Sequence, residues 1–382
     1  MRAFTHLATL ARRSAVGAFA AVAIAGTTTP ASAIASTAAV ATTAQLAAAQ
    51  PGSATSVGQW ANRLWDAAER GDEAAFSTLL SDAPESADPA LLDAIELFQA
   101  NLAARETLRQ EQIAEATEEL REVLNSERTP QTLSEGLVIA LQLSEVSRDR
   151  EAVLADPRIN ELVRAADRAA REAEQREDWL IANELFFRLN ELYLTEAIYL
   201  DDLDRQNRRL AQLQFYNPRR LWELRNERRL MEEDGEPLPP YNPLADGFED
   251  KLRGVDLRAV RIALRDSASG HVDQQAGVRE ILVGGLDSLE TMLTTADTRA
   301  AFPNLSEDRA YQGLLDLVRS ERARLRAQDG VASSSEIYTV LNRLMRRNNE
   351  LGRPVPGEAL LHEFGNGATG ELDQVSAIIW PD

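Results

Sequence analysis

The sequence predicts an all-α protein, and three observations lead to this fold class. Apolar residues recur at helical spacing from Trp60 onward, proline follows Asp or Asn where several helices would begin, and no stretch alternates apolar and polar residues with β-branched enrichment. The 382 residues are enough to bury a sizeable core in more than one domain. We therefore expect a helical bundle followed by a second helical module.

The N-terminal part of the chain is expected to serve export rather than folding. Arginines precede a short apolar segment at Ser14–Gly26, and Ala31-Ser32-Ala33 forms a small-residue cleavage site; together these features are typical of a signal peptide over residues 1–33. The apolar segment is too short to span a bilayer, so no stable transmembrane anchor is expected after cleavage. Residues 34–58 are rich in Ala, Thr and Ser and indicate a flexible tether. We expect localisation in the periplasm or envelope of a bacterium, by either export pathway.

Residues 59–234 are expected to form a helical domain. Trp60 and Leu64 share a helix face, Gly71 stands at a C-cap position, and Asp72 is placed to cap the next helix. An N-cap residue followed by proline at the first helical position predicts further helix starts at Asp88-Pro89, Asp156-Pro157 and Asn217-Pro218.

One helix pair in this domain resembles a tetratricopeptide hairpin. Small residues on the first helix would let large residues of the second helix pack closely. The small residues are Ala166, Ala169, Ala170 and Ala173, and the second helix carries Trp179, Ala182, Phe186 and Leu189. The closing proline and a second copy of the repeat are not found, so an ordinary amphipathic helix pair is the alternative.

A proline-rich linker is expected at residues 235–249, followed by a second helical module at 250–382. Four helices of that module are indicated by apolar residues at helical spacing: Val260 and Leu264; Val278, Ile281, Leu282, Leu286 and Leu289; Leu314, Leu317, Val318 and Leu325; Ile337, Leu341 and Leu344.

Composition excludes several kinds of chemistry. The chain has no cysteine, which excludes disulfides, thiolate metal sites and cysteine nucleophiles. The formal charge of −20 argues against nucleic-acid binding, which needs a basic face. Lys251 is the single lysine, and histidine occurs only at positions 6, 271 and 362. We assign no catalytic residue, no metal ligand and no cofactor.

Three local patterns resemble functional sites, but the residues around each favour a structural interpretation. His362-Glu363 opens like a zinc-binding H-E-x-x-H helix, but position 366 is Asn, so His362 is expected to be a partly buried or surface helix residue. Ser333-Ser334-Ser335 precedes no lysine that could activate a serine, and we expect a helix cap there, before a helix beginning near Glu336. The acidic run Asp201–Asp204 lacks the glycine and distal glutamate of a calcium loop and is expected to be a solvated helix face.

The segment after His362 carries a family resemblance. Gly367-Ala368-x-Gly370-x-Leu372-Asp373-x-x-Ser376 resembles the segment that closes the helical region of carboxy-terminal processing (tail-specific) serine peptidases, just before their PDZ domain. In physical terms, the small residues would let a helix approach its neighbour, Leu372 would bury, and Asp373 and Ser376 would cap a turn. A looser similarity lies upstream, at His271-Val272-Asp273 and Ile281–Leu289, so that the resemblance covers roughly Val255–Asp382.

The resemblance implies a non-catalytic helical region of an exported serine endopeptidase. The family's PDZ domain, serine nucleophile and lysine would lie beyond Asp382, so we expect a natural truncation or a fragment. The residues give two alternatives: an envelope tetratricopeptide-like module that binds a protein or peptide, and a stand-alone hydrolytic enzyme, for which no carboxylate pair can be chosen. Self-association is left open.

Overall fold

The computed structural model describes residues 56–84, 86–231, 235–270, 277–328, 332–372 and 377–380. All regular structure in these ranges is helical and none of it is strand, which confirms the all-α fold class. The expected signal peptide and nearly all of the expected tether lie outside the described residues. In the part that is described, no helix combines the length and the apolar character needed to cross a membrane.

The chain divides into two compact units, Met1–Asp93 and Ala94–Asp382. The first contains α2 (Val57–Glu69) and α3 (Glu73–Ser81), which pack against each other.

The end of α2 and the start of α3 agree with the sequence prediction. Gly71 has φ +66°, the left-handed conformation that suits glycine after a helix, and the Asp72 carboxylate accepts a hydrogen bond from the Ala75 amide at 3.0 Å. Trp60 is buried, and its Nε1 donates to the Leu79 carbonyl at 2.7 Å. Local signals therefore account for this hairpin.

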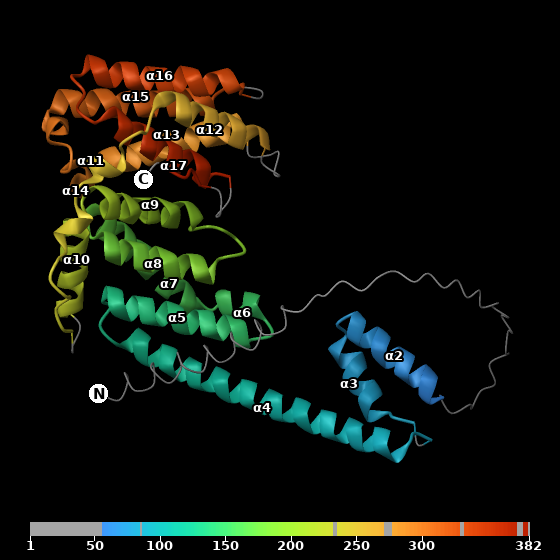
Figure 1. The fold of residues 1–382 in the computed structure, drawn as a ribbon. Helices are drawn as coiled ribbons and strands as arrows, with labels where there is room; N and C mark the ends of the chain where they lie inside the picture. The colour runs from blue at the N-terminus through green and yellow to red at the C-terminus, as the bar shows by residue number, and fades with distance from the viewer. Residues whose placement is uncertain are drawn as a thin grey trace, which may run out of the picture. The chain divides into compact units, whose positions relative to one another are not determined.

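The second unit begins within the long helix α4 and continues through six further helices that pack mainly on their neighbours along the chain (Figure 1). Their bounds are α4 (Pro89–Asn125), α5 (Pro130–Val146), α6 (Arg150–Leu154), α7 (Pro157–Gln175), α8 (Trp179–Leu192), α9 (Leu200–Tyr216) and α10 (Pro218–Met231). The three expected proline starts are confirmed, because α4, α7 and α10 begin at Pro89, Pro157 and Pro218.

Helices α7 and α8 pack tightly on each other. Ala166, Ala170 and Ala173 are fully buried on α7, and Phe186 and Leu189 are fully buried on α8. Small side chains opposite large ones let the two helices approach closely. This contact lies in a core cluster that also takes in the C-terminal half of α4 and helix α5.

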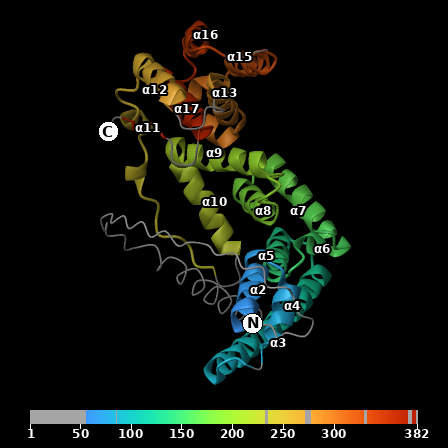
Figure 2. The same cartoon turned by 90° about the vertical axis from the view of Figure 1, so that its right-hand side faces the viewer.

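The C-terminal part of this unit is built around α13, which contacts α17, α15 and α9 (Figures 1 and 2). Its elements are η1 (Pro243–Ala245), α11 (Phe248–Lys251), α12 (Leu257–Gly270), α13 (Val278–Thr294), α14 (Ala296–Arg299), η2 (Pro303–Ser306), α15 (Asp308–Arg326), α16 (Ser334–Glu350) and α17 (Gly357–Gly370). The apolar residues expected to mark α12, α13, α15 and α16 lie in or against one core cluster. The proline-rich residues 235–249 connect α10 to this part, within the second unit.

Candidate functional site

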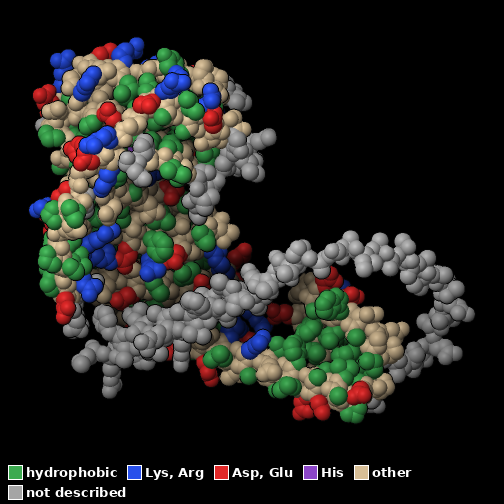
Figure 3. Space-filling model, viewed as in Figure 1, with side chains coloured by type: hydrophobic (Ala, Val, Ile, Leu, Met, Phe, Trp, Pro, Cys, Tyr) green, Lys and Arg blue, Asp and Glu red, His purple; other side chains and the backbone are tan. Residues whose placement is uncertain are grey.

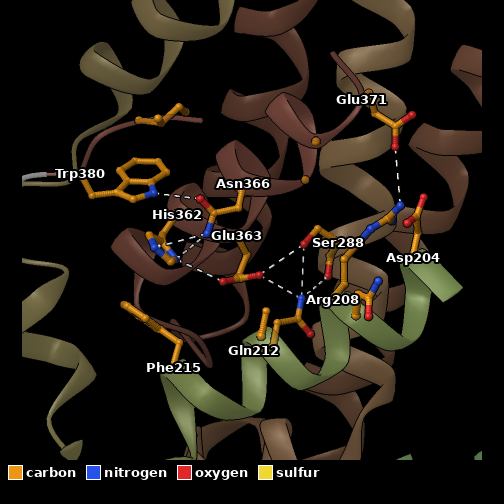
Figure 4. A pocket seen from close by; sticks show the side chains of 15 residues that line it. Asp204, Arg208, Gln212, Phe215, Ser288, His362, Glu363, Asn366, Glu371 and Trp380 are labelled. Atoms are coloured by element: carbon orange, nitrogen blue, oxygen red, sulfur yellow. Dashed lines mark hydrogen bonds and ion pairs between the residues drawn. The ribbon is translucent and has the colours of Figure 1, made fainter. Parts of the chain in front are cut away.

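A cavity of about 480 Å³ lies where α9 meets α13 and α17 (Figure 4). This volume is in the range of small-molecule and side-chain binding sites. Helix α9 lines it with polar and aromatic side chains, α17 with His362 and its neighbours, and the segment Ala377–Trp380 with two apolar side chains. The cavity therefore joins parts of the chain that are far apart in sequence.

The site exists because α13 and α17 cross at very short range. A Cβ atom on Gly367 would lie 2.4 Å from the Gly284 carbonyl oxygen, and one on Gly284 would lie 2.6 Å from the Gly367 oxygen. The next residue on α13, Gly285, lies over the ring of Phe364, which is fully buried one turn before Gly367 on α17. Only glycine at these positions permits this backbone approach.

A buried polar network lies under the cavity at this crossing. The Gln212 amide Nε2 donates to Glu363 Oε2 and to the Ser288 carbonyl, both at 2.9 Å. The Ser288 hydroxyl donates to the same carboxylate oxygen at 3.3 Å. The three side chains come from α9, α13 and α17 and are almost fully buried, so they tie the three helices together.

Aromatic side chains form one wall of the site. The His362 ring stacks on Phe215 with 4.4 Å between centroids, and its Nδ1 lies 3.1 Å from Glu363 Oε1 and 3.2 Å from the Tyr216 hydroxyl. Burial, followed by the charge of Glu363, raises the pKa of Tyr216 well above its ordinary value. Tyr216 is therefore a neutral hydrogen-bonding group in this cluster.

The non-helical segment Ala377–Trp380 lies against α17. The Trp380 indole Nε1 donates to Asn366 Oδ1 at 2.8 Å, and its ring lies 4.8 Å from that of His362. A Cβ atom on Gly365 would come within 2.7 Å of the Trp380 ring and 2.9 Å of the Ile378 side chain, whereas Ile379 between them is 96% exposed. Alternate side chains thus face the helix, as in an extended peptide.

The other end of the cavity carries the charges. Asp204 and Arg208 lie one helical turn apart on α9, and Arg208 Nη2 is 3.6 Å from Glu371 Oε1, just past the end of α17 (Figure 4). Burial raises the pKa of Asp204, and so does Asp201, although Arg208 opposes the shift. Burial also raises the pKa of Glu371. This end therefore holds more negative charge than its one arginine balances.

The Ser288 hydroxyl is held by a glutamate and a glutamine rather than by a histidine or lysine base. In the described ranges no three acidic or histidine side chains are grouped so as to hold a metal ion. Lys251, on α11, lies beside the site, with its Nζ 5.6 Å from the centroid of the Phe215 ring that lines the cavity.

The three patterns that resemble functional sites lie on helices or at a helix start. His362 lies on α17 and is only 5% exposed, so it is more deeply buried than expected. The expected solvated face at Asp201–Asp204 is wrong in part, because Asp202 pairs with Arg171 and Arg205 with its side chain 16% exposed, and Asp204 lines the cavity. Ser333 occupies the N-cap position of α16, and the helix begins at Ser334, two residues before the expected start near Glu336. Its hydroxyl lies 2.7 Å from the Ser335 hydroxyl and makes no capping bond to the backbone, because the neighbouring serine engages it instead.

Part of the segment that carries the family resemblance lies at this site. Gly367 faces Gly284 at the crossing, and Ala368 is fully buried. Gly370 ends α17, where a Cβ would meet nothing within 4 Å, and Leu372 packs partly buried against the core. Asp373 and Ser376 lie outside the described residues, as does His271-Val272-Asp273.

The sequence predicts a solvated face for Asp204 and makes no prediction for the other side chains that α9 contributes to the cavity. Asp204, Arg208 and Gln212 recur at intervals of four residues, so they share one helix face. That polar stripe was the available signal, but a polar stripe is ordinarily solvated.

No family profile, curated protein or solved structure matches this chain.

Proposed function

We propose that this chain is a non-catalytic helical module that binds protein segments. The observation that carries the proposal is that a peptide segment, Ala377–Trp380, already docks on α17 through an indole hydrogen bond and two apolar side chains. The surface around Gly365, His362 and Asn366 therefore has the chemistry to hold an Ile-x-Trp segment. A segment of another protein with that pattern would make the same contacts.

The packing of successive helices also supports a binding module. Helices α5, α7, α8, α9 and α13 contact one another in chain order, as they do in helical-repeat proteins, whose extended faces bind peptides. The pairing of buried alanines on α7 with Phe186 and Leu189 on α8 fits a tetratricopeptide-like hairpin. In the exported setting expected from the N-terminus, such a module would act in the cell envelope.

The docking surface can be tested with the chain's own segment supplied as a separate peptide. The chain's own Ala377–Trp380 segment competes with an added peptide for the same surface, at an effective concentration of about millimolar for a short tether. Trp380→Ala weakens this competition because it removes the docked indole. A labelled acetyl-Ala-Ile-Ile-Trp-amide peptide should then bind at least tenfold more tightly to Trp380→Ala than to the unaltered chain, as measured by fluorescence anisotropy.

Matched variants make this test specific. Adding Gly365→Ala to Trp380→Ala should abolish binding, because the new Cβ occupies the place of the docked side chains, whereas adding Gly370→Ala should leave it unchanged. Trp65→Ala, at a tryptophan that is 72% exposed elsewhere, should behave like the unaltered chain. Absence of saturable binding to Trp380→Ala would refute the proposed function.

A second candidate places this module in a tail-specific serine endopeptidase. The observation that favours it is that Gly284 and Gly367, which come from the two segments resembling that family, meet at the α13–α17 crossing. In that setting the module would present substrate proteins or organise subunits, and the serine and lysine would come from outside these residues.

Under this second candidate, the isolated chain should hydrolyse nothing. We expect no new fragments after overnight incubation of the pure chain with an unfolded protein, followed by mass spectrometry. Cleavage that copurifies with the chain and persists in the presence of inhibitors of contaminating proteases would contradict a non-catalytic role.

A further inference from the structure

We infer that the acidic end of the cavity receives a basic side chain, arginine or lysine, of the protein segment that docks on α17. The inference rests on the proposed function, and it adds a specificity determinant to it. The docked segment Ala377–Trp380 carries no cation of its own.

Among the described residues, the charges around the cavity leave one carboxylate with neither a hydrogen bond nor an ion pair, although the charge of Arg208 acts on it. Of the three acidic side chains in the lining, Glu363 is held by Gln212 and Ser288, and Glu371 faces Arg208. Asp204 has neither a hydrogen bond nor an ion pair within the described part of the chain, although it is half-buried. Arg208 is the one lysine or arginine among the residues that line the cavity.

A charge in this position is costly without a counterion. Partly removing a carboxylate from water favours its neutral form unless a cation lies nearby. The raised pKa values of Asp204 and Glu371 have this origin. A guanidinium or ammonium group placed between these two carboxylates would supply the missing charge and could form charge-assisted hydrogen bonds to both.

The geometry of α9 sets where the basic residue would lie on the peptide. Asp204 and Phe215 are separated by about 16 Å along the helix, at a rise of about 1.5 Å per residue. An extended chain advances about 3.3 Å per residue, and an arginine side chain adds its own reach. A cation three or four residues from the Ile-x-Trp element would therefore reach Asp204.

Gln212 lies between the two ends of the cavity (Figure 4). It is 3% exposed, its Nε2 is bound to Ser288 and Glu363, and its Oε1 has no hydrogen-bond partner. This oxygen is itself fully buried, so it stays an unsatisfied acceptor beneath the middle of the site.

The test compares charged and neutral peptides on the Trp380→Ala chain. One labelled peptide has an arginine followed by three alanines before Ile-Ile-Trp, and a second has three alanines followed by an arginine after it. Two matched peptides carry glutamine in place of the arginine. In one of the two orders, we expect the arginine peptide to bind about tenfold more tightly than its glutamine counterpart. Asp204→Asn should reduce that preference to twofold or less, and Asp204→Glu should keep most of it.

Controls separate this inference from the function on which it rests. Glu172→Gln, on α7 with its side chain 64% exposed, should leave the preference unchanged, and circular-dichroism melting checks that each variant is folded. Equal, saturable binding of arginine and glutamine peptides, or a preference that survives Asp204→Asn, would overturn the basic-side-chain inference alone. Failure of every peptide to bind would overturn the proposed function, and this inference with it.

Discussion

Replacing Gly367 with alanine should lower the free energy of unfolding by about 3 kcal/mol, the upper end of the usual cost of overpacking a core. The added Cβ would lie 2.4 Å from both the Gly284 carbonyl oxygen and the Ser288 Cβ. Because one of these atoms belongs to the backbone and the other lies directly next to it, no rotamer change can relieve the contact. Helices α13 and α17 would have to move apart, opening the core of the C-terminal part.

This prediction has a matched control on the same helix. Gly370→Ala adds the same methyl group where nothing lies within 4 Å, so its stability should stay within about 0.5 kcal/mol of the unaltered chain. Both variants are measured by urea unfolding monitored by circular dichroism. Equal midpoints for the two variants would show that the α13–α17 crossing is not as close as described.

Replacing Glu174 with glutamine should lower the free energy of unfolding by about 2 kcal/mol at pH 7, the scale of losing hydrogen bonds to charged groups. The Glu174 carboxylate on α7 accepts hydrogen bonds from Arg205, at 2.8 and 3.0 Å, and from Arg209 on α9. Arg209 is only 7% exposed and lies over the Trp179 ring. Removing the carboxylate would leave that buried cation without its anionic partner.

The same ion pairs predict how stability depends on pH. Burial acts to raise the pKa of Glu174, but the hydrogen bonds and charges of Arg205 and Arg209 outweigh it and lower the pKa to about 2. A carboxyl group whose pKa is lower in the folded state stabilises the fold above its unfolded pKa, and that contribution is lost as the pH falls toward the folded value. Stability from this group should therefore decline between about pH 4.5 and pH 2.

A comparison of variants tests whether Glu174 causes the loss of stability at low pH. Urea midpoints measured from pH 7 to pH 3 should fall less steeply for Glu174→Gln than for the unaltered chain, because the variant lacks the titrating group. Glu172→Gln serves as the control, since Glu172 lies on the same helix with its side chain 64% exposed. If both variants follow the unaltered chain, the ion pairs between α7 and α9 do not contribute as described.

The sequence determined the fold class and many helix starts, because these depend on neighbouring residues. Proline has no amide hydrogen to lose at the first helical position, and an aspartate before it accepts a backbone amide, so α4 and α7 begin at Pro89 and Pro157. Helical spacing of apolar residues likewise identified most of the α12–α16 core. None of these predictions depends on contacts between residues that are far apart in the sequence.

The partners at the site were decided only by the tertiary structure. Gln212 meets Glu363 across 151 residues of sequence, and Gly284 meets Gly367 because two helices cross where neither carries a side chain. On α9, the face bearing Asp204 and Arg208 is, in sequence, indistinguishable from a solvated one. Local propensity cannot specify which distant helix will cover a given face, because that depends on how the whole core packs. In this protein, the packing of α13 and α17 near α9 places its polar stripe along one wall of a cavity.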